Sequence, residues 1–369
     1  MRISIDCTPL LVRSAGVKNY LYHWLRAIRA ALPAGDVLSL YPLVDEPRSL
    51  NHQASQNSLP KTVRSLATLH LVNKLGWVPA WAEPASDVFH VTPHMRADVG
   101  KRALTTTLYD LTTLVHPEMH LAANVAVEKR FHTQVLRRAA RVLAISEHTR
   151  RDALEHLGLP PERVQVVYPG VAEPYFHAQP AAPAWLAARG LQKPFALCVG
   201  TIEPRKNVER LLAAWLALPA GVRTGFDLVI AGPAGWKSEA VLARLNAGVE
   251  GVRYLGYVPE DDLPALTASA ILLAYPSLYE GFGFPAAQAM ACGVPVLTST
   301  SSCLPEIVGD AGLCVDPVSE AEIRAGLERL LTSPALREQL GRAGRDRAQL
   351  YTWERCGKAS VEFFRAAMG

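Results

Sequence analysis

The chain has 369 residues, of which 49% are hydrophobic and 20% charged, and its formal net charge is +4. This composition is typical of a soluble globular protein and excludes a disordered or fibrous chain, and the length suits two domains of ordinary size. No apolar run approaches the roughly 18 residues that a membrane-spanning helix needs. The apolar N-terminal run contains Asp6 and lacks a small-residue cleavage site, so it predicts a strand and not a signal peptide.

The positive charge is concentrated in one half of the chain. Residues 1–190 carry 21 Lys and Arg against 15 Asp and Glu, whereas residues 191–369 carry 17 against 19. The N-terminal half is therefore the expected side for an anionic acceptor or an anionic membrane surface, and simple solvation is the alternative.

The cysteines form no C-x-x-C pair, and most lie in apolar runs. They predict reduced, buried thiols of a cytoplasmic protein, without zinc or disulfides. The six positions are Cys7, Cys198, Cys292, Cys303, Cys314 and Cys356.

Short β-rich runs alternate with helical patterns in residues 1–175. This alternation predicts a doubly wound α/β domain, in which helices cover both faces of a parallel sheet. The proline- and alanine-rich segment 172–193 predicts a linker. We expect strands at residues 2–5, 36–43, 87–91, 103–110, 141–146 and 163–169, and helices around residues 17–31, 124–138 and 148–157.

Residues 190–350 repeat this plan and predict a second doubly wound, Rossmann-like domain. The tail from about Arg337 is helical in pattern, with Trp353 as an expected anchor. Ligands of open α/β sheets bind at the carboxyl ends of the strands, so two such domains would face a shared cleft. We expect strands at residues 195–200, 226–232, 252–258, 271–276, 294–299 and 312–317, and helices that begin near Asn207, Ser238, Asp262, Pro285 and Ser319.

The loop "GTIEPRKN" ends the first of these strands and suits an anion. Arg205 and Lys206 stand before a helix that Asn207 is expected to cap. The helix N-terminus favours negative charge, and a guanidinium beside an ammonium suits a diphosphate. A solvated basic pair is the alternative interpretation.

The loop "EGFGFPAAQAM" follows another strand and begins at Glu280. Its glycines permit a turn close to a ligand, and Pro285 is expected at the first position of a helix. Gln288 is the only polar side chain in that helix before Cys292, so it either reaches a ligand or satisfies a neighbouring loop backbone. Together the two loops predict a site for a nucleoside diphosphate.

Other sites are disfavoured or left open. No G-x-G-x-x-G, P-loop or G-x-S-x-G motif follows an expected strand, and the absence of Asp-x-Asp implies no metal. His90 and His94 are expected to line a loop rather than to bind a metal. Trp77 and Trp81, near Lys74, are either an interfacial membrane anchor or packed against the core.

Several motifs carry a family resemblance. The runs "GTIEPRKN", "YPSLYEGFGFPAAQAMACGVPVL", "SSCLPEIVGDAGLCVDP" and "VYPGV", and more loosely "AGVKNY", "LYDLTTLVHPE" and "ISEHTRRDAL", resemble retaining glycosyltransferases of the GT-B fold, family 4. Within that family they resemble the mannosyltransferases of polysaccharide assembly. The resemblance implies two Rossmann-like domains facing a cleft, with an acceptor-binding domain at 1–175, a nucleotide-sugar domain at 190–350, and a final helix at about 353–369 that packs back onto the first.

The resemblance also implies roles for individual residues. Arg205 and Lys206 would hold the donor diphosphate, Glu280 would bind the transferred sugar, and Asp110 would orient acceptor or donor. Gln288 would take the ribose hydroxyls, and Gly256 to Val258 would frame the base. The expected donor-binding residues are Gly16, Gly200, Thr201, Tyr257, Val258, Gly281, Phe282, Gly283, Phe284 and Gln288.

The chain departs from the family pattern at two positions. Gln288 stands where the family's Glu-x7-Glu motif has its second glutamate, so a charge-assisted bond to the ribose is lost. Tyr109 stands where many relatives have the histidine of a His-Asp pair, so a role for that histidine cannot be carried over.

The function implied by the resemblance is retaining, metal-independent transfer of mannose from GDP-mannose, without a cofactor. The acceptor would be a glycan or a polyprenyl-linked oligosaccharide in lipopolysaccharide or exopolysaccharide biosynthesis. The protein would be cytoplasmic or peripheral at the inner face of the membrane, and no nucleic-acid partner is expected. The alternatives are a sugar-nucleotide-binding protein with little catalysis, and an epimerase or phosphorylase on the same fold.

Overall fold

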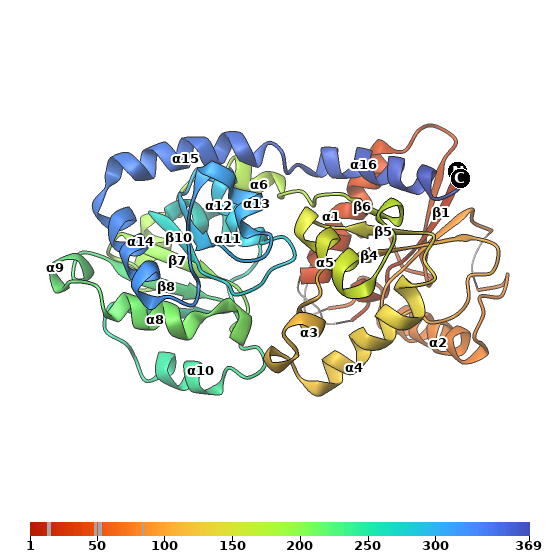
Figure 1. Cartoon of the computed structure of the whole chain (residues 1–369), viewed down its shortest axis with the longest axis horizontal. Coiled ribbons are helices and arrows are strands. Elements are labelled where there is room, and N and C mark those ends of the chain that lie inside the picture. Colours follow the sequence, from red (N-terminus) through yellow and green to blue (C-terminus); the bar gives the residue numbers. More distant parts are fainter. Residues whose placement is uncertain (13–15, 48–49, 51–53, 83–84) are drawn as a thin grey trace. The chain divides into compact units, whose positions relative to one another are not determined.

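A computed structural model describes the chain except for residues 13–15, 48–49, 51–53 and 83–84. It divides into two compact units (Figure 1). Unit 1 comprises residues 1–114, 122–170 and 352–369, and unit 2 comprises residues 115–121 and 171–351. Each unit contains one parallel sheet, which confirms the predicted fold of two doubly wound α/β domains.

Unit 1 is built on a sheet of six parallel strands in the order β2-β1-β3-β4-β5-β6. Every residue of β3 is buried, and so is every residue of β5 after Arg141, as expected for strands that are covered on both faces. The strands are β1 (Arg2–Asp6), β2 (Val37–Tyr41), β3 (Val88–Val91), β4 (Ala103–Leu108), β5 (Arg141–Ala144) and β6 (Val164–Val166).

The helices of unit 1 include the last helix of the chain, which packs on the first. The indole Nε1 of Trp24 donates to Ser360 Oγ at 2.7 Å, and both side chains are buried. A Cβ at Gly357 would lie 2.3 Å from the carbonyl oxygen of Ala27, so this contact needs glycine. The helices are α1 (Gly16–Ala31), α2 (Leu59–Leu75), α4 (Ala122–Phe131), α5 (Glu147–Leu157) and α16 (Trp353–Ala366); α3 (Thr112–Val115) lies where the chain leaves unit 1.

Unit 2 is built on a second parallel sheet, in the order β12-β11-β10-β7-β8-β9. Its core packs α8 and α14 on one face around the fully buried Trp215. The strands are β7 (Phe195–Val199), β8 (Asp227–Ala231), β9 (Val252–Gly256), β10 (Leu272–Tyr275), β11 (Val296–Ser299) and β12 (Gly312–Val315). The helices are α6 (Glu173–Phe176), α7 (Pro183–Ala187), α8 (Val208–Leu216), α9 (Ala220–Arg223), α10 (Glu239–Asn246), α11 (Leu263–Ser269), α12 (Phe284–Ala291), α13 (Leu304–Val308), α14 (Glu320–Thr332) and α15 (Pro334–Ala348).

Three local predictions need correction. Pro285 is the second residue of α12, because Phe284 already has helical geometry. The segment predicted as a linker contains the short helices α6 and α7. Asn207 does precede α8, but its side chain makes no capping hydrogen bond.

All six cysteines are free; five of them have the predicted burial, and Cys314 is partly exposed. In the described part of the chain, no helix is both long enough and apolar enough to span a membrane.

Candidate functional site

The candidate site lies at the carboxyl edge of the sheet of unit 2. Strands β7 and β10 are hydrogen-bonded neighbours, so the loops that follow them start side by side. The loop after β7 forms one turn of 3₁₀ helix at Pro204–Lys206, and its Arg205 carbonyl accepts a hydrogen bond from the Leu278 N–H at 2.7 Å. This arrangement brings Arg205, Lys206 and Glu280 together.

Five side chains form what we call the cation–carboxylate cluster: Glu203, Arg205, Lys206, Tyr275 and Glu280. Lys206 Nζ lies 2.6 Å from Glu280 Oε1, and Arg205 Nη1 lies 2.5 Å from Glu280 Oε2. The Tyr275 hydroxyl donates to Glu280 Oε1 at 2.6 Å, and Arg205 Nε pairs with Glu203 Oε1 at 2.6 Å. Glu280 therefore receives a cation on each of its two oxygens.

The electrostatics of this cluster keep Glu280 ionised. Burial raises the pKa of the Glu280 carboxyl, but the charges of Arg205 and Lys206 outweigh it and bring that pKa down to about 2. Burial and the charge of Arg205 lower the pKa of Lys206, against the opposing effect of Glu280. The positive charges of the two cations equal the negative charges of the Glu203 and Glu280 carboxylates. An arriving diphosphate would therefore have to share or replace the carboxylates' contacts with the cations.

Asn207 ties together three of the loops at this edge. Its backbone adopts the left-handed conformation, with φ at 60°. Its side-chain amide donates to the carbonyl oxygens of Pro276 at 3.0 Å and Pro317 at 2.7 Å, which follow β10 and β12. The residue predicted as a helix cap therefore fixes the loops that carry the cluster.

The glycine-rich turn after Glu280 leaves backbone donors available. Gly283 precedes α12 with φ at 82°, and a Cβ there would lie 2.6 Å from Leu304 Cδ2. Among the described residues, no hydrogen-bond acceptor is found for the backbone N–H groups of Phe282, Gly283 and Phe284. Free amides at the start of a helix are suited to an anion.

Gln288 lies in α12 and is only partly buried. Its carboxamide makes no hydrogen bond with any described residue, so the interpretation that it satisfies a neighbouring loop backbone is wrong. The side chain remains available for a ligand.

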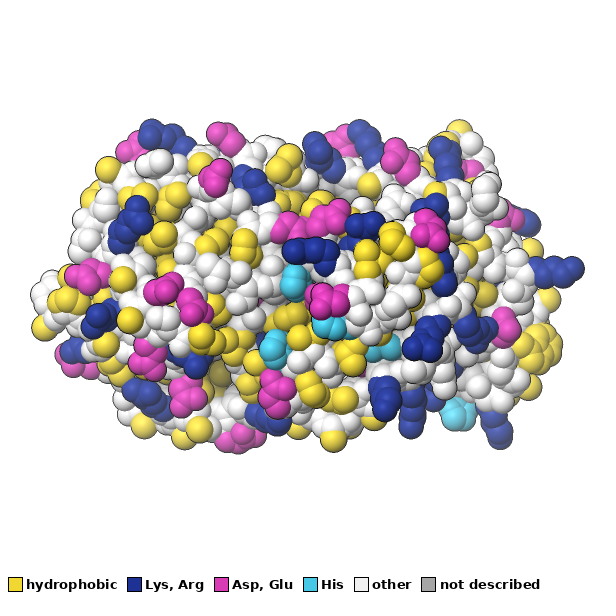
Figure 2. Space-filling model, viewed as in Figure 1, with side chains coloured by type: hydrophobic (Ala, Val, Ile, Leu, Met, Phe, Trp, Pro, Cys, Tyr) yellow, Lys and Arg dark blue, Asp and Glu magenta, His cyan; other side chains and the backbone are white. Residues whose placement is uncertain are grey.

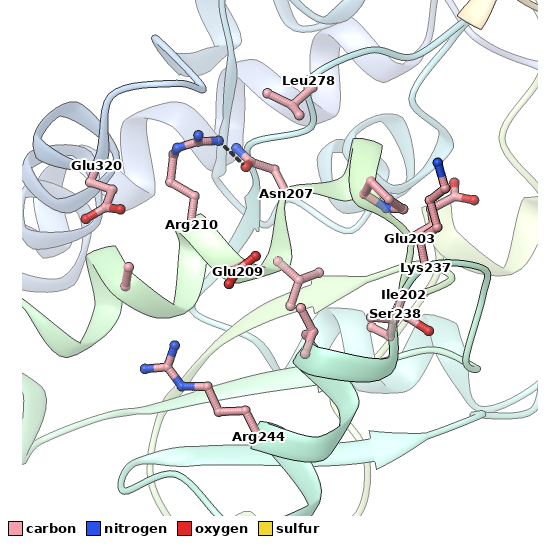
Figure 3. Close-up of a pocket in the computed structure, with 14 residues that line it drawn as sticks. Ile202, Glu203, Asn207, Glu209, Arg210, Lys237, Ser238, Arg244, Leu278 and Glu320 are labelled. Atoms are coloured by element: carbon pink, nitrogen blue, oxygen red, sulfur yellow. Dashed lines mark hydrogen bonds between the residues drawn. The ribbon is translucent and has the colours of Figure 1, made fainter. Parts of the chain in front are cut away.

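The other donor residues expected in unit 2 lie on loops at the same edge. Gly200 and Thr201 follow β7, and the Gly200 N–H donates to the carbonyl of Ala231 at 2.9 Å. Tyr257 and Val258 follow β9; Tyr257 is 48% exposed, whereas Val258 is buried. A cavity of about 490 Å³ lies between the starts of α8 and α10 (Figure 3). Of the cluster residues it touches Glu203, and its rim carries charges of both signs.

Gly16 and Asp110 belong to unit 1. Gly16 is the exposed first residue of α1, and Asp110 follows β4. Asp110 Oδ1 accepts hydrogen bonds from the N–H and the hydroxyl of Thr112, at 2.9 and 2.8 Å. The structure thus places both residues at the carboxyl edge of the first sheet.

Two side chains near Asp110 were missed by the sequence analysis. Burial and the charge of Asp110 raise the pKa of Glu128 to about 7, and burial lowers the pKa of His132 to about 4. His132 Nε2 lies 3.7 Å from Glu128 Oε2 and has no hydrogen-bond partner among the described residues. A π-helical turn at His132–Leu136 orients His132, and such turns are frequent at functional sites.

On unit 1, one prediction and one of two open alternatives are wrong. His90 lies in β3, not in a loop, and its ring nitrogens are 3.1 and 3.0 Å from the hydroxyls of Thr105 and Thr107. Trp77 and Trp81 do not pack in the core, because they are 54% and 64% exposed. No cluster of three His, Cys, Asp or Glu side chains suited to a metal occurs among the described residues.

Sequence comparison identifies the family. Residues 187–347 match the model of glycosyl transferases group 1, and residues 46–173 match that of glycosyltransferase family 4. The O-antigen chain mannosyltransferase B of Escherichia coli is 34% identical over 292 residues, which cover 78% of this chain and 76% of that protein. This chain belongs to the group 1 glycosyltransferases. The serotype-specific mannosyltransferase WbdA of Escherichia coli is 27% identical to this glycosyltransferase over 324 residues, 85% of its length but 39% of WbdA.

Solved structures confirm the GT-B fold of this glycosyltransferase. The sucrose-phosphate synthase of Thermosynechococcus elongatus superposes with a TM-score of 0.71 at 21% identity, over 99% of this chain and 98% of that one. WaaG, a glycosyltransferase involved in lipopolysaccharide biosynthesis, superposes with a TM-score of 0.68 at 18% identity, over 98% of both chains.

The sequence did not predict three residues of this site, which are Glu203, Tyr275 and Ser302. Ser302 Oγ accepts a hydrogen bond from the Glu280 N–H at 3.0 Å and so helps to position that carboxylate. Glu203 stands two residues before Arg205, and this spacing was a usable signal for an ion pair. Tyr275 and Ser302 carry no such signal, because only the sheet places them beside Glu280.

Proposed function

We propose that this glycosyltransferase transfers mannose from GDP-mannose to a glycan or lipid-linked oligosaccharide acceptor in polysaccharide biosynthesis. Transfer would retain the anomeric configuration and need no metal. The observation that carries the proposal is the cation–carboxylate cluster beside the free amides at the start of α12. Mannose as the sugar is supported by two of the relatives, the O-antigen chain mannosyltransferase B and WbdA, which are mannosyltransferases. A nucleotide-sugar donor is supported by HepE, a protein of the same fold whose structure contains UDP and glucose.

The cluster suits departure of a nucleoside diphosphate. When the bond from the anomeric carbon to the diphosphate oxygen breaks, the electron pair stays on the diphosphate. Arg205 and Lys206 would stabilise that charge in a partly buried site, where the interaction is stronger than in water. The acceptor hydroxyl would attack from the same face and pass its proton to the departing phosphate oxygen. Glu280 would release contacts to the cations and accept hydrogen bonds from the sugar hydroxyls.

Substitution of the two cations tests this proposal. Arg205→Ala and Lys206→Ala should each lower the rate of mannosyl transfer by about a hundredfold or more, because each removes one preorganised contact to the leaving group. The matched control is Arg324→Ala, an exposed arginine of α14 outside the site. Transfer near the wild-type rate in either variant, with the fold intact, would refute the assignment.

A thermal-shift panel identifies the donor. GDP-, UDP- and ADP-sugars are compared at equal concentration, and a ligand at a hundred times its dissociation constant adds roughly 2.7 kcal/mol to the stability. We expect GDP-mannose to stabilise the protein most. A larger shift with a UDP- or ADP-sugar would contradict the proposed donor and leave the transferase assignment standing.

Gln288 and Tyr109 motivate a second candidate, a sugar-nucleotide-binding protein with little catalysis. Stabilisation by a nucleotide sugar, combined with a complete lack of donor hydrolysis and of transfer to every acceptor tested, would favour it. Release of sugar phosphate with inorganic phosphate present would instead indicate a phosphorylase, and interconversion of the free nucleotide sugar would indicate an epimerase.

A further inference from the structure

Unit 1 contains a second cavity, and none of the residues assigned above to the donor or the acceptor lines it. It has a volume of about 390 Å³ and lies between α2, the loop after β3 and the end of α4. Asn73 of α2 fixes that loop, because its amide donates to the His94 carbonyl at 2.9 Å and its carbonyl accepts from the Arg96 N–H at 2.7 Å. We call this cavity the α2–α4 pocket.

The rim of the α2–α4 pocket is cationic. The charged side chains that line it are Arg96 and Arg130; His70 and His94 also line it, and no Asp or Glu does. Neither the Arg96 nor the Arg130 guanidinium forms an ion pair or hydrogen bond with a described residue. Figure 2 shows Lys and Arg side chains gathered beside α4 and α2 along the lower edge of the view. Two unpaired guanidinium groups around one cavity suit a phosphate or diphosphate, which each can bind in a bidentate manner.

The Asp98 carboxylate, on the same loop, does not neutralise this rim. It lies 3.2 Å from Arg138 Nη2, outside the residues that line the pocket. The pocket thus keeps an excess of positive charge inside a unit whose sequence is itself basic.

The floor of the α2–α4 pocket is apolar, and exposed apolar side chains continue from it. Val127 lines the pocket and is 50% exposed. Leu59 and Val63 precede Leu66 by two turns and one turn of α2, on the same face, and they are 77% and 59% exposed. The apolar residues that line the pocket are Leu66, Leu69, Pro93, Val127, Phe131 and Val135.

We propose that the α2–α4 pocket binds the phosphate head of a lipid, with the lipid chain lying on the apolar side chains of α2 and α4. A free inorganic anion would use the arginines but would leave this apolar surface exposed to water. A neutral glycan would leave the two guanidinium groups unpaired. The proposal rests on the proposed function only in naming a lipid-linked acceptor as the source of that phosphate.

Direct binding to the full chain tests the proposal. Farnesyl diphosphate, inorganic pyrophosphate and farnesol are titrated by calorimetry against the wild type, against the double variant Arg96→Ala/Arg130→Ala, and against Arg151→Ala. Arg151 is an exposed arginine of α5 in the same unit, and it serves as the matched control. We expect farnesyl diphosphate to bind at least tenfold more tightly than pyrophosphate, the double variant to lose at least tenfold in affinity, and the control to match the wild type.

Further measurements distinguish binding in this pocket from binding at the donor site and from binding to a bilayer. Lys206→Ala should leave farnesyl diphosphate binding unchanged. If binding is instead lost in Lys206→Ala and kept in the double variant, the diphosphate binds at the cation–carboxylate cluster and the proposal is overturned. Equal affinity for pyrophosphate and farnesyl diphosphate would also overturn it, as would binding to phosphatidylglycerol vesicles without binding to farnesyl diphosphate. Mannosyl transfer to a lipid-free oligosaccharide is measured in parallel, because its absence bears on the proposed function and not on the pocket.

Discussion

Replacing Glu280 by glutamine tests the central electrostatic feature of this glycosyltransferase. Glu280 is 5% exposed and is the carboxylate that Lys206 contacts, whereas Arg205 keeps Glu203 as a second partner. Glutamine preserves the size of the side chain and removes the charge. Lys206 would then be a buried cation without a carboxylate partner, which is strongly destabilising.

The pKa of Glu280 gives the size of the expected loss of stability. Its depression from 4.5 to about 2 corresponds to about 3 kcal/mol of stabilisation of the ionised form in the folded state. Because the folded pKa is lower than the unfolded one, this contribution is present above pH 4.5 and is lost as the pH falls toward 2. We therefore expect Glu280→Gln to lower the free energy of unfolding by about 3 kcal/mol at pH 7.

The assay is chemical denaturation of both proteins at several pH values between 7 and 3.5. The difference in stability between wild type and Glu280→Gln should shrink below pH 4.5, because the unfolded wild type then gains a proton at Glu280 while the folded protein, with its pKa of about 2, does not. Glu239→Gln, at an exposed position of α10, is the control and should change stability little at any pH. A stability loss in Glu280→Gln that stays constant across this range would refute the reasoning, because packing and not charge would then account for it.

Three further predictions concern single side chains. Gln288→Glu restores a charge-assisted bond to ribose and should tighten nucleoside-diphosphate binding by about tenfold in calorimetry; unchanged affinity would remove Gln288 from the ribose site. Burial lowers the pKa of His90 to about 3, so the wild type should lose stability as the pH falls below 6.5, where only the unfolded state gains the proton. His90→Gln should flatten that part of the curve of melting temperature against pH, and an equally steep curve in the variant would assign the acid sensitivity elsewhere. In Gly283→Ala the new Cβ would stand at a positive φ and close to Leu304. This variant should lower the free energy of unfolding by about 1–3 kcal/mol in denaturant. Gly35→Ala, at a positive φ with no neighbour within 4 Å, should cost less, and an equal cost would show that the contact with Leu304 contributes nothing.

The sequence by itself determined the fold class and the two loops that carry the candidate site. Alternating strand and helix patterns predicted two parallel sheets. The spacing of apolar residues differs between helices and strands, because it reflects a backbone geometry that neighbouring residues set locally. The start of α14 was also predictable, because the side chain of Ser319 accepts a hydrogen bond from the Glu322 N–H and so caps the helix over a few positions.

The tertiary structure alone decided which side chains meet. Arg205 and Glu280 are 75 positions apart and become partners only because β7 and β10 pair in the sheet. The same holds for Asn207, whose local position predicted a cap but whose amide binds carbonyl groups after β10 and β12. It holds also for the α2–α4 pocket, whose arginines come from a loop and from a helix that no local pattern relates. Local chemistry sets which element forms, and the pairing of distant strands sets which charges share one site.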